Sequence, residues 1–259
     1  MKNLSGSVVR IVAAVCVVAV LGVMASTAAA ESADDLIAAS IKAQGGRDAL
    51  LGLKALERKG EVNLDGTFGQ MDGTVEEVLI PWKKARRSLD LAVFVQDEGY
   101  DGEVAWRDGM MGLQKLEGAE AAQIKQSVEL NPFVMIEKNG TAAEKLDDET
   151  VDDVEYNVVE LTPKEGPKVK FYLDKDSHLI KRTALTQNNP QFGEIQITVV
   201  TDDYKEFGPI KLSTKDTVTL GDIFEIETVY TETKVNGEVD ETIFAMPSED
   251  AGDSGDDSN

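Results

Sequence analysis

Apolar and polar residues alternate along several short stretches of this chain, and this period of two constrains the fold more than any other feature. Residues 169–174, 195–199 and 229–235 each follow the alternation. Residues 89–96 follow it as well, which predicts a further strand there. Because each such strand has one apolar and one polar face, the pattern predicts an antiparallel sheet with one side covered.

Pairs of Asn, Asp and Gly separate these stretches at short intervals. Asn and Asp tolerate a positive φ and Gly has no steric penalty there, so such pairs are typical of tight turns. They occur at Asp65-Gly66, Asp72-Gly73, Asp101-Gly102, Asp108-Gly109, Asn139-Gly140, Gly166-Pro167, Gly221-Asp222 and Asn236-Gly237. We expect about 10 or 11 strands, and a twisted sheet of that many strands must curl or split.

Three stretches with helical periodicity interrupt the strands. Residues 32–44 begin with Ser32 and Asp35 in the spacing of a capping box, and residues 47–53 form a second short helix. Residues 117–129 form the third helix. These helices are too short to bury themselves, so we expect the sheet to curl around them. The fold class is therefore mainly β with some α.

The first thirty residues have the pattern of a secretory signal peptide. Lys2 and Arg10 form a basic beginning, residues 11–24 are uncharged and apolar, and Ala28-Ala29-Ala30 is a cleavage pattern. We expect cleavage after Ala30 and a periplasmic location. A retained membrane helix is the alternative, but the apolar run is shorter than the ~20 residues that span a bilayer. Lipidation at Cys16 is disfavoured because the residue immediately before it, Val15, is not small.

Cleavage would leave 229 of the 259 residues, without any cysteine. The exported chain could then form no disulfide bond and perform no thiol chemistry. No shift in composition marks a linker, so residues 31–247 are expected to form one domain. Residues 248–259 are acidic and lack large apolar side chains, which predicts a disordered tail.

The net charge is strongly negative, at −22 for the whole chain, and it would be −24 after loss of Lys2 and Arg10. Nucleic-acid phosphates and anionic lipid surfaces attract Lys and Arg, so this charge argues against both as partners. Strong net charge also keeps a protein in solution.

The sequence contains little that could perform catalysis or bind a metal. His178 is the only histidine and is expected in a hairpin turn, and a zinc site needs several Cys or His ligands. Residues 147–149 and 152–153 are acidic but lack the pattern of a calcium-binding loop. We expect no metal, no cofactor and no catalysis, although two carboxylates brought together by the fold remain a possible hydrolase site.

Large apolar residues near the predicted turns could line a ligand cavity, as they do in small barrels that side chains do not fill. Ordinary core packing is the alternative for each of them. Trp106 is of special interest because it follows the turn Asp101-Gly102 in a short strand over residues 103–107 and shares a face with Val104. The candidate cavity residues are Phe68, Leu79, Trp82, Leu91, Val93, Val104, Trp106, Met111, Phe133, Met135 and Phe171.

Several segments in order resemble the periplasmic outer-membrane lipoprotein-sorting family, the LolA/LolB-like carriers and a broader group of sorting-like proteins. They span residues 33–247. The segments are residues 80–87 with their early proline, Tyr100-Asp101-Gly102 with Trp106, residues 131–136, residues 160–174, and the closing residues 239–247; residues 43–50 resemble the broader group.

This resemblance implies an incomplete β-barrel whose short helices form a lid over an apolar cavity. In the carriers that cavity holds lipoprotein acyl chains in transit between membranes. One position departs from the family, because the carrier has an arginine immediately before the proline and this chain has Ile80. The fold is therefore expected to carry over better than the carrier's release cycle.

We expect an exported periplasmic binding protein that shelters a lipid acyl chain or lipoprotein, in transport to the outer membrane. The alternative is a non-catalytic envelope sensor or interaction module with the same fold and a protein partner. A hydrolase ranks third.

Overall fold

The computed structural model describes residues 31–248 except residues 68, 165 and 190–192. The expected signal peptide, and residues 249–259 of the expected tail, lie outside the described residues. The described residues from Glu31 onward belong to one compact unit.

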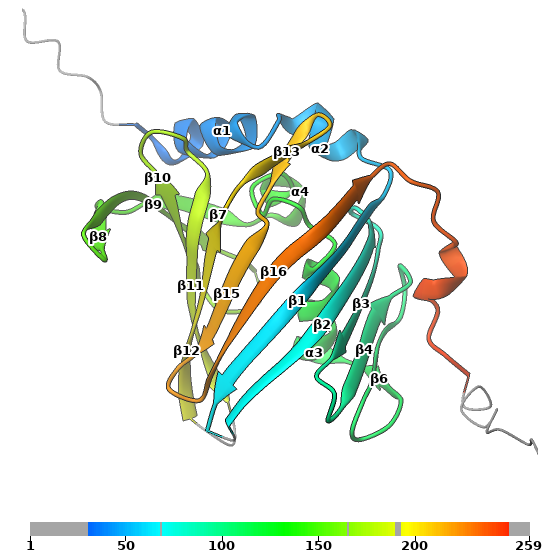
Figure 1. Cartoon of the computed structure of the whole chain (residues 1–259). Coiled ribbons are helices and arrows are strands. Elements are labelled where there is room, and N and C mark those ends of the chain that lie inside the picture. Colours follow the sequence, from blue (N-terminus) through cyan, green and yellow to red (C-terminus); the bar gives the residue numbers. More distant parts are fainter. Residues whose placement is uncertain (1–30, 68, 165, 190–192, 249–259) are drawn as a thin grey trace, which may run out of the picture. The chain divides into compact units, whose positions relative to one another are not determined.

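The strands form one large antiparallel sheet that curves around the helices (Figure 1). Among the described residues its edge strands, β6 and β7, do not pair with each other, so the sheet is open. In hydrogen-bonded order it consists of β6 (Gln114–Leu116), β5 (Ala105–Asp108), β4 (Val95–Tyr100), β3 (Lys84–Asp90), β2 (Gly69–Ile80), β1 (Leu56–Gly66), β16 (Phe224–Val235), β15 (Lys215–Leu220), β12 (Gly193–Asp202), β11 (Ile180–Asn189), β10 (Val169–Asp174), β9 (Val154–Thr162) and β7 (Ala142–Lys145).

Three more short strands complete the count. β8 (Glu149–Val151) pairs with β9, and β13 (Lys205–Phe207) pairs with β14 (Ile210–Leu212) as a separate ribbon. The predicted fold class is confirmed, but the described residues contain more strands than the ten or eleven we expected, because several turns were not recognised.

The three predicted helices are present, and the described residues contain two further short helices that the sequence did not predict. α1 (Ala33–Ala43) has the expected capping box between Ser32 and Asp35, and α2 (Arg47–Gly52) follows it. α3 (Gly118–Gln126) and the short α4 (Ile136–Asn139) come between β6 and β7. In Figure 1, α1 and α2 cross one end of the sheet and α3 lies behind β1 and β2. A 3-10 helix, η1 (Glu241–Phe244), follows the last strand.

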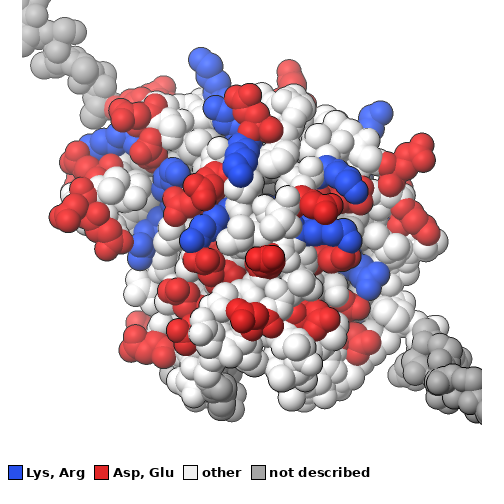
Figure 2. Space-filling model, viewed as in Figure 1, with Lys and Arg blue, Asp and Glu red and all other residues white. Residues whose placement is uncertain are grey.

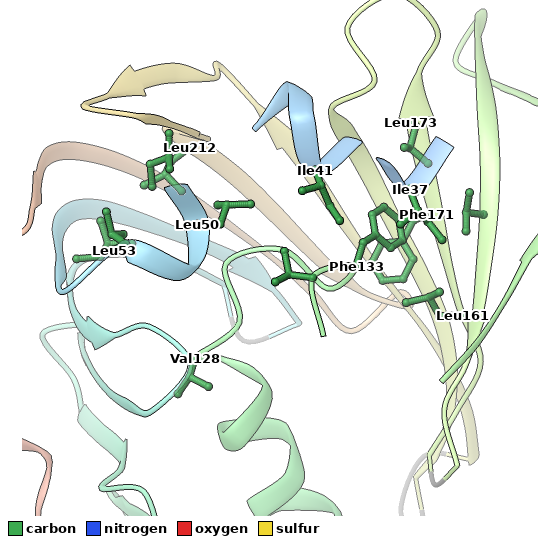
Figure 3. Packing of buried hydrophobic residues seen from close by; sticks show 14 of the residues in the cluster. Ile37, Ile41, Leu50, Leu53, Val128, Phe133, Leu161, Phe171, Leu173 and Leu212 are labelled. Carbon is green, nitrogen blue, oxygen red and sulfur yellow. The ribbon is translucent and has the colours of Figure 1, made fainter. Parts of the chain in front are cut away.

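The main core lies between the helices and the inner face of the sheet (Figure 3). α1 contributes Ile37 and Ile41, and the sheet contributes Phe171. Phe133 is fully buried and meets Phe171 edge to face, with ring centroids 5.2 Å apart. The segment of residues 127–135 therefore runs through the interior.

The predicted strand over residues 89–96 is wrong, because a hairpin turn divides it into β3 and β4. Ala92 has a φ of 63°, and its backbone N–H donates to the Asp90 carboxylate at 2.9 Å. The turn leaves Val93 and Val95 exposed, at 73% and 51% of their surface. The alternation of apolar and polar residues continues through the turn by coincidence. The period of two therefore could not reveal that the chain reverses direction there.

The predicted turn at Asp72-Gly73 is also wrong, since both residues lie inside β2. Gly73 is needed there for a different reason. A Cβ at this position would come within 2.0 Å of the Asp90 carbonyl oxygen on β3. The glycine therefore allows two strands to approach closely and does not reverse the chain.

Candidate ligand cavity

A cavity of about 330 Å³ lies between the inner face of the sheet and the segment formed by α3 and residues 127–132. Part of its wall is apolar. The apolar side chains come from five strands and the covering segment: Leu56, Leu79, Ala85, Leu130, Phe171 and Ile180. This volume is at the low end of the roughly 300–1,000 Å³ typical of small-molecule sites.

Hydrogen bonds tie the covering segment to α1 and to the β2–β3 turn. The Gln44 side chain donates to the Leu130 carbonyl oxygen at 3.1 Å and accepts from the Asn131 side chain at 2.8 Å. The Trp82 backbone N–H donates to the Val128 carbonyl oxygen at 2.9 Å. Because Gln44 and Asn131 are buried, these bonds hold the cover in one position.

A row of alternating charges crosses the inner face of five neighbouring strands, and we call it the charge ladder. The register places one charged residue of each strand directly opposite the next. From β1 to β5 the ladder is Arg58, Glu77, Arg87, Glu98 and Arg107, and the first four of these residues line the cavity.

The Arg58–Glu77 pair anchors the ladder. Nε and Nη2 of Arg58 donate to one Glu77 oxygen at 3.2 and 2.8 Å, and the Tyr230 hydroxyl donates to the other at 2.8 Å. Arg58 also lies 3.5 Å above the centre of the Tyr230 ring. Burial alone would raise the pKa of Glu77, but Arg58, Arg87 and these hydrogen bonds outweigh burial and lower it. The pair is therefore ionised and tightly held.

The other end of the ladder is held by α3. Arg107 lies 3.4 Å from Glu98 and 3.3 Å from Glu120 of α3, so the helix packs against this end of the inner face. Arg87, between the two ends, lies 3.4 Å from Glu77. Among the described residues, its guanidinium makes no hydrogen bond.

Asp216 on β15 is a further charged residue of the cavity wall, and its carboxylate feels the charge of Arg58. Its carboxylate accepts from the Ser213 hydroxyl at 2.7 Å. Burial raises the pKa of Asp216 despite the opposing effects of Arg58 and this hydrogen bond. The cavity wall is therefore apolar in one part and lined by buried charge in another.

Three solved structures have similar folds at low sequence identity. A domain from Vibrio parahaemolyticus named as an outer membrane lipoprotein-sorting protein is 10% identical, covering 81% of this chain and 94% of its own, with a TM-score of 0.55. A LolA superfamily protein from Nitrosomonas europaea is 11% identical, covering 83% and 98%, with a TM-score of 0.58. A DUF1329 family protein from Desulfovibrio piger is 9% identical, covering 82% and 97%, also with a TM-score of 0.58. The chain therefore has a LolA-like fold. No family model and no curated protein matches the sequence.

Within this LolA-like fold, few of the predicted cavity residues line the cavity. Leu79 and Phe171 do so. Phe133, Met135 and Trp82 pack in the main core instead, and the Trp82 indole donates to the Leu50 carbonyl oxygen at 3.0 Å.

The remaining candidates lie elsewhere. Leu91 is buried in a second cluster, with Val62 and Val75. Val104 is half-buried beside the β4–β5 turn, and Phe68 lies outside the described residues. Val93 and Met111 do not belong to the cavity, because they project from hairpin turns with 73% and 85% of their surface exposed.

Trp106 occupies the outer face of the sheet, opposite the cavity. Its neighbour Arg107 faces inward in the ladder, so the alternation turns Trp106 outward. The indole N–H donates to the Phe244 carbonyl oxygen of η1 at 2.9 Å, and both residues are almost fully buried. A Cβ at Gly99, its partner on β4, would come within 2.6 Å of the ring. We call Trp106, Phe244 and Gly99 the outer clasp.

The charge ladder is the part of the site that sequence reasoning missed. In a hairpin, residues equally distant from the turn face each other, so the ladder follows once every turn is known. The unrecognised turn at residues 91–94 concealed the pairing of Arg87 with Glu98.

The described residues contain no group of three or more His, Cys, Asp or Glu placed to hold a metal ion. His178 lies in the β10–β11 turn, as predicted, with a φ of 56°. None of the described helices is long and apolar enough to cross a membrane.

Proposed function

We propose that this chain is an exported, periplasmic, non-catalytic binding protein that shelters a lipid acyl chain, including that of a lipoprotein, in the cavity beneath the covering segment. The observation that supports this most directly is the cavity of about 330 Å³ with Leu79, Leu130 and Phe171 in its wall. The similar fold of a domain named for outer membrane lipoprotein sorting is consistent with this function.

The size of the cavity favours one chain over several. Each buried methylene contributes about 0.8 kcal/mol, so one long chain would gain on the order of 10 kcal/mol before ordering and desolvation costs are subtracted. The tied covering segment would exclude water from that chain. Arg58 and Tyr230 hold Glu77 as a carboxylate, so Glu77 has no proton to donate as a general acid.

The test is mass spectrometry of lipid extracted from protein purified from its native periplasm. We expect near-stoichiometric lipid in the wild type. Leu130→Trp fills the cavity and should remove the lipid, whereas Leu51→Trp adds the same bulk at a position on α2 that is 42% exposed and should retain it. Equal lipid-free spectra for all three folded proteins would contradict the proposal.

A second candidate, an envelope sensor or interaction module, is favoured by exposed apolar side chains at two neighbouring turns. Val93 and Val95 lie at the β3–β4 turn, and Met110 and Met111 lie at the β5–β6 turn, all exposed. Exposed apolar clusters often mark protein contacts. A photo-crosslinking residue at position 111 would favour this role if it captured one defined envelope protein from lipid-free material.

A further inference from the structure

Arg87 differs from the other two arginines of the charge ladder. Arg58 has two hydrogen bonds to Glu77, and Arg107 bridges Glu98 and Glu120. Arg87 has only an ion pair with Glu77, at 3.4 Å, and that carboxylate already accepts hydrogen bonds from Arg58 and Tyr230. Its register partner on the other side, Glu98, is held by Arg107.

The Arg87 guanidinium is therefore an unused donor group in the cavity wall. A guanidinium has five N–H donors in a planar fork, which suits the two oxygens of a carboxylate or a phosphate. The side chain is 31% exposed, so solvent or a bound ligand can reach it.

The apolar part of the wall is close to this donor group. Leu79 lies two residues from Glu77 along β2, and Ala85 lies two residues from Arg87 along β3, on the same face of the sheet. Two residues of a strand span about 7 Å. A molecule with a polar head at Arg87 can therefore place its apolar chain against Leu79 and Phe171.

Resting on the proposed function, we propose that the cavity binds a single-chain amphiphile with an oxyanion head group, and that Arg87 binds that head. The head is a carboxylate or a phosphate, since both offer paired oxygens to the guanidinium. The charge ladder thus binds the head group of the ligand, and the apolar part of the cavity wall binds its chain.

The test compares ligands that share a twelve-carbon acyl or alkyl chain and differ in the head group. Laurate, dodecyl phosphate and uncharged monolaurin are titrated into the lipid-free chain by calorimetry. We expect the wild type to bind at least one of the two anions about 10-fold or more tightly than monolaurin, because a charged hydrogen bond is worth ~1.5–3 kcal/mol. The preferred anion identifies a carboxylate or a phosphate head.

Variants assign this preference to Arg87. Arg87→Gln should lose about 10- to 100-fold in anion affinity while monolaurin binding changes little, and Arg87→Lys should recover only part of it. Lys84→Gln is the matched control, because it removes one positive charge from the outer face of the same strand, where Lys84 pairs with Glu241. It should leave anion binding unchanged.

The outcomes separate the two proposals. Equal wild-type affinity for the anions and monolaurin would overturn the role of Arg87 and leave the lipid-binding function intact, and this comparison needs no variant to fold. An Arg87→Gln protein that keeps the wild-type preference would overturn it as well. If the folded wild type binds none of the three molecules, the proposed function itself fails.

Discussion

The two faces of strands β1–β5 differ in the kind of side chain that they carry, even where the residues are adjacent in the chain. The inner face carries the charge ladder beside the cavity, whereas the outer face carries the outer clasp beneath η1. Arg107 and Trp106 are neighbours in the chain, yet one joins the charge ladder and the other is an almost fully buried aromatic residue. The comparison teaches that the most apolar residue of a strand need not face the ligand cavity, because a distant segment can cover the other face.

Removing the tryptophan of the outer clasp should have the largest effect. Trp106→Ala should lower the free energy of unfolding by about 4 kcal/mol, because it leaves a large void beneath η1. Urea denaturation measures this change. Apolar-probe binding per folded molecule should stay within about twofold of the wild type, since the ring does not line the cavity. Lost binding with unchanged stability would reverse our assignment of the two faces.

Breaking the anchor of the charge ladder should cost slightly less. Glu77→Gln leaves Arg58 buried without its carboxylate, so the free energy of unfolding should fall by about 3 kcal/mol. Glu76→Gln is the matched control on the outer face, where the exposed pair with Lys59 is screened by solvent and should contribute little to stability.

The effect of Glu77→Gln on the free energy of unfolding should also depend on pH. The pKa of Glu77 is lowered in the folded chain, so its stabilisation is present above the unfolded-state pKa and is lost as pH falls through the folded-state value. The difference between wild type and Glu77→Gln should therefore shrink in acid. A difference that is constant with pH would contradict an ionised Glu77.

The close approach within the outer clasp can be tested by adding one methyl group. Gly99→Ala places a Cβ against the Trp106 ring and should cost about 2 kcal/mol. In the Trp106→Ala background the same substitution should cost almost nothing, because the ring that it meets is absent. A double-mutant cycle by urea denaturation measures this coupling.

The smallest effect should come from Asp216, the buried carboxylate of the cavity wall. Burial raises the pKa of Asp216, so its contribution to stability is full below the unfolded-state pKa and is lost as pH rises through the folded-state value. Asp216→Asn should therefore raise stability by on the order of 1 kcal/mol at neutral pH and leave it nearly unchanged in acid. Thermal unfolding at both pH values tests this. A variant that is less stable at neutral pH would show that Asp216 is a favourable partner of Arg58.

Short-range sequence patterns were sufficient to predict the local structures that they form. The Ser32–Asp35 capping box placed the start of α1, and the Asp101-Gly102 pair placed the β4–β5 turn, where the Asp101 carboxylate accepts two backbone N–H groups. These features involve residues within a few positions of each other, so they can be read without knowing the fold.

Features that depend on distant contacts could not be predicted in the same way. The turn at residues 91–94 has no Gly or Asn-Gly signal, and without it the alignment of Arg87 with Glu98 does not emerge. The alternation of apolar and polar residues placed Trp106 on one of the two faces of the sheet but could not show whether that face lines the cavity. That choice depends on Phe244, which lies 138 positions away.

The pairing of β1 with β16 bears on when the sheet can form during synthesis. Leu56 lies opposite Val235, so the middle of the sheet joins the first strand to the last. Contacts so distant in sequence form slowly. Until β16 leaves the ribosome, β1 has a neighbour on one side only and its other edge stays open to pairing with another chain. A chain that ends before Phe224 would keep that open edge permanently, so we expect such truncations to aggregate.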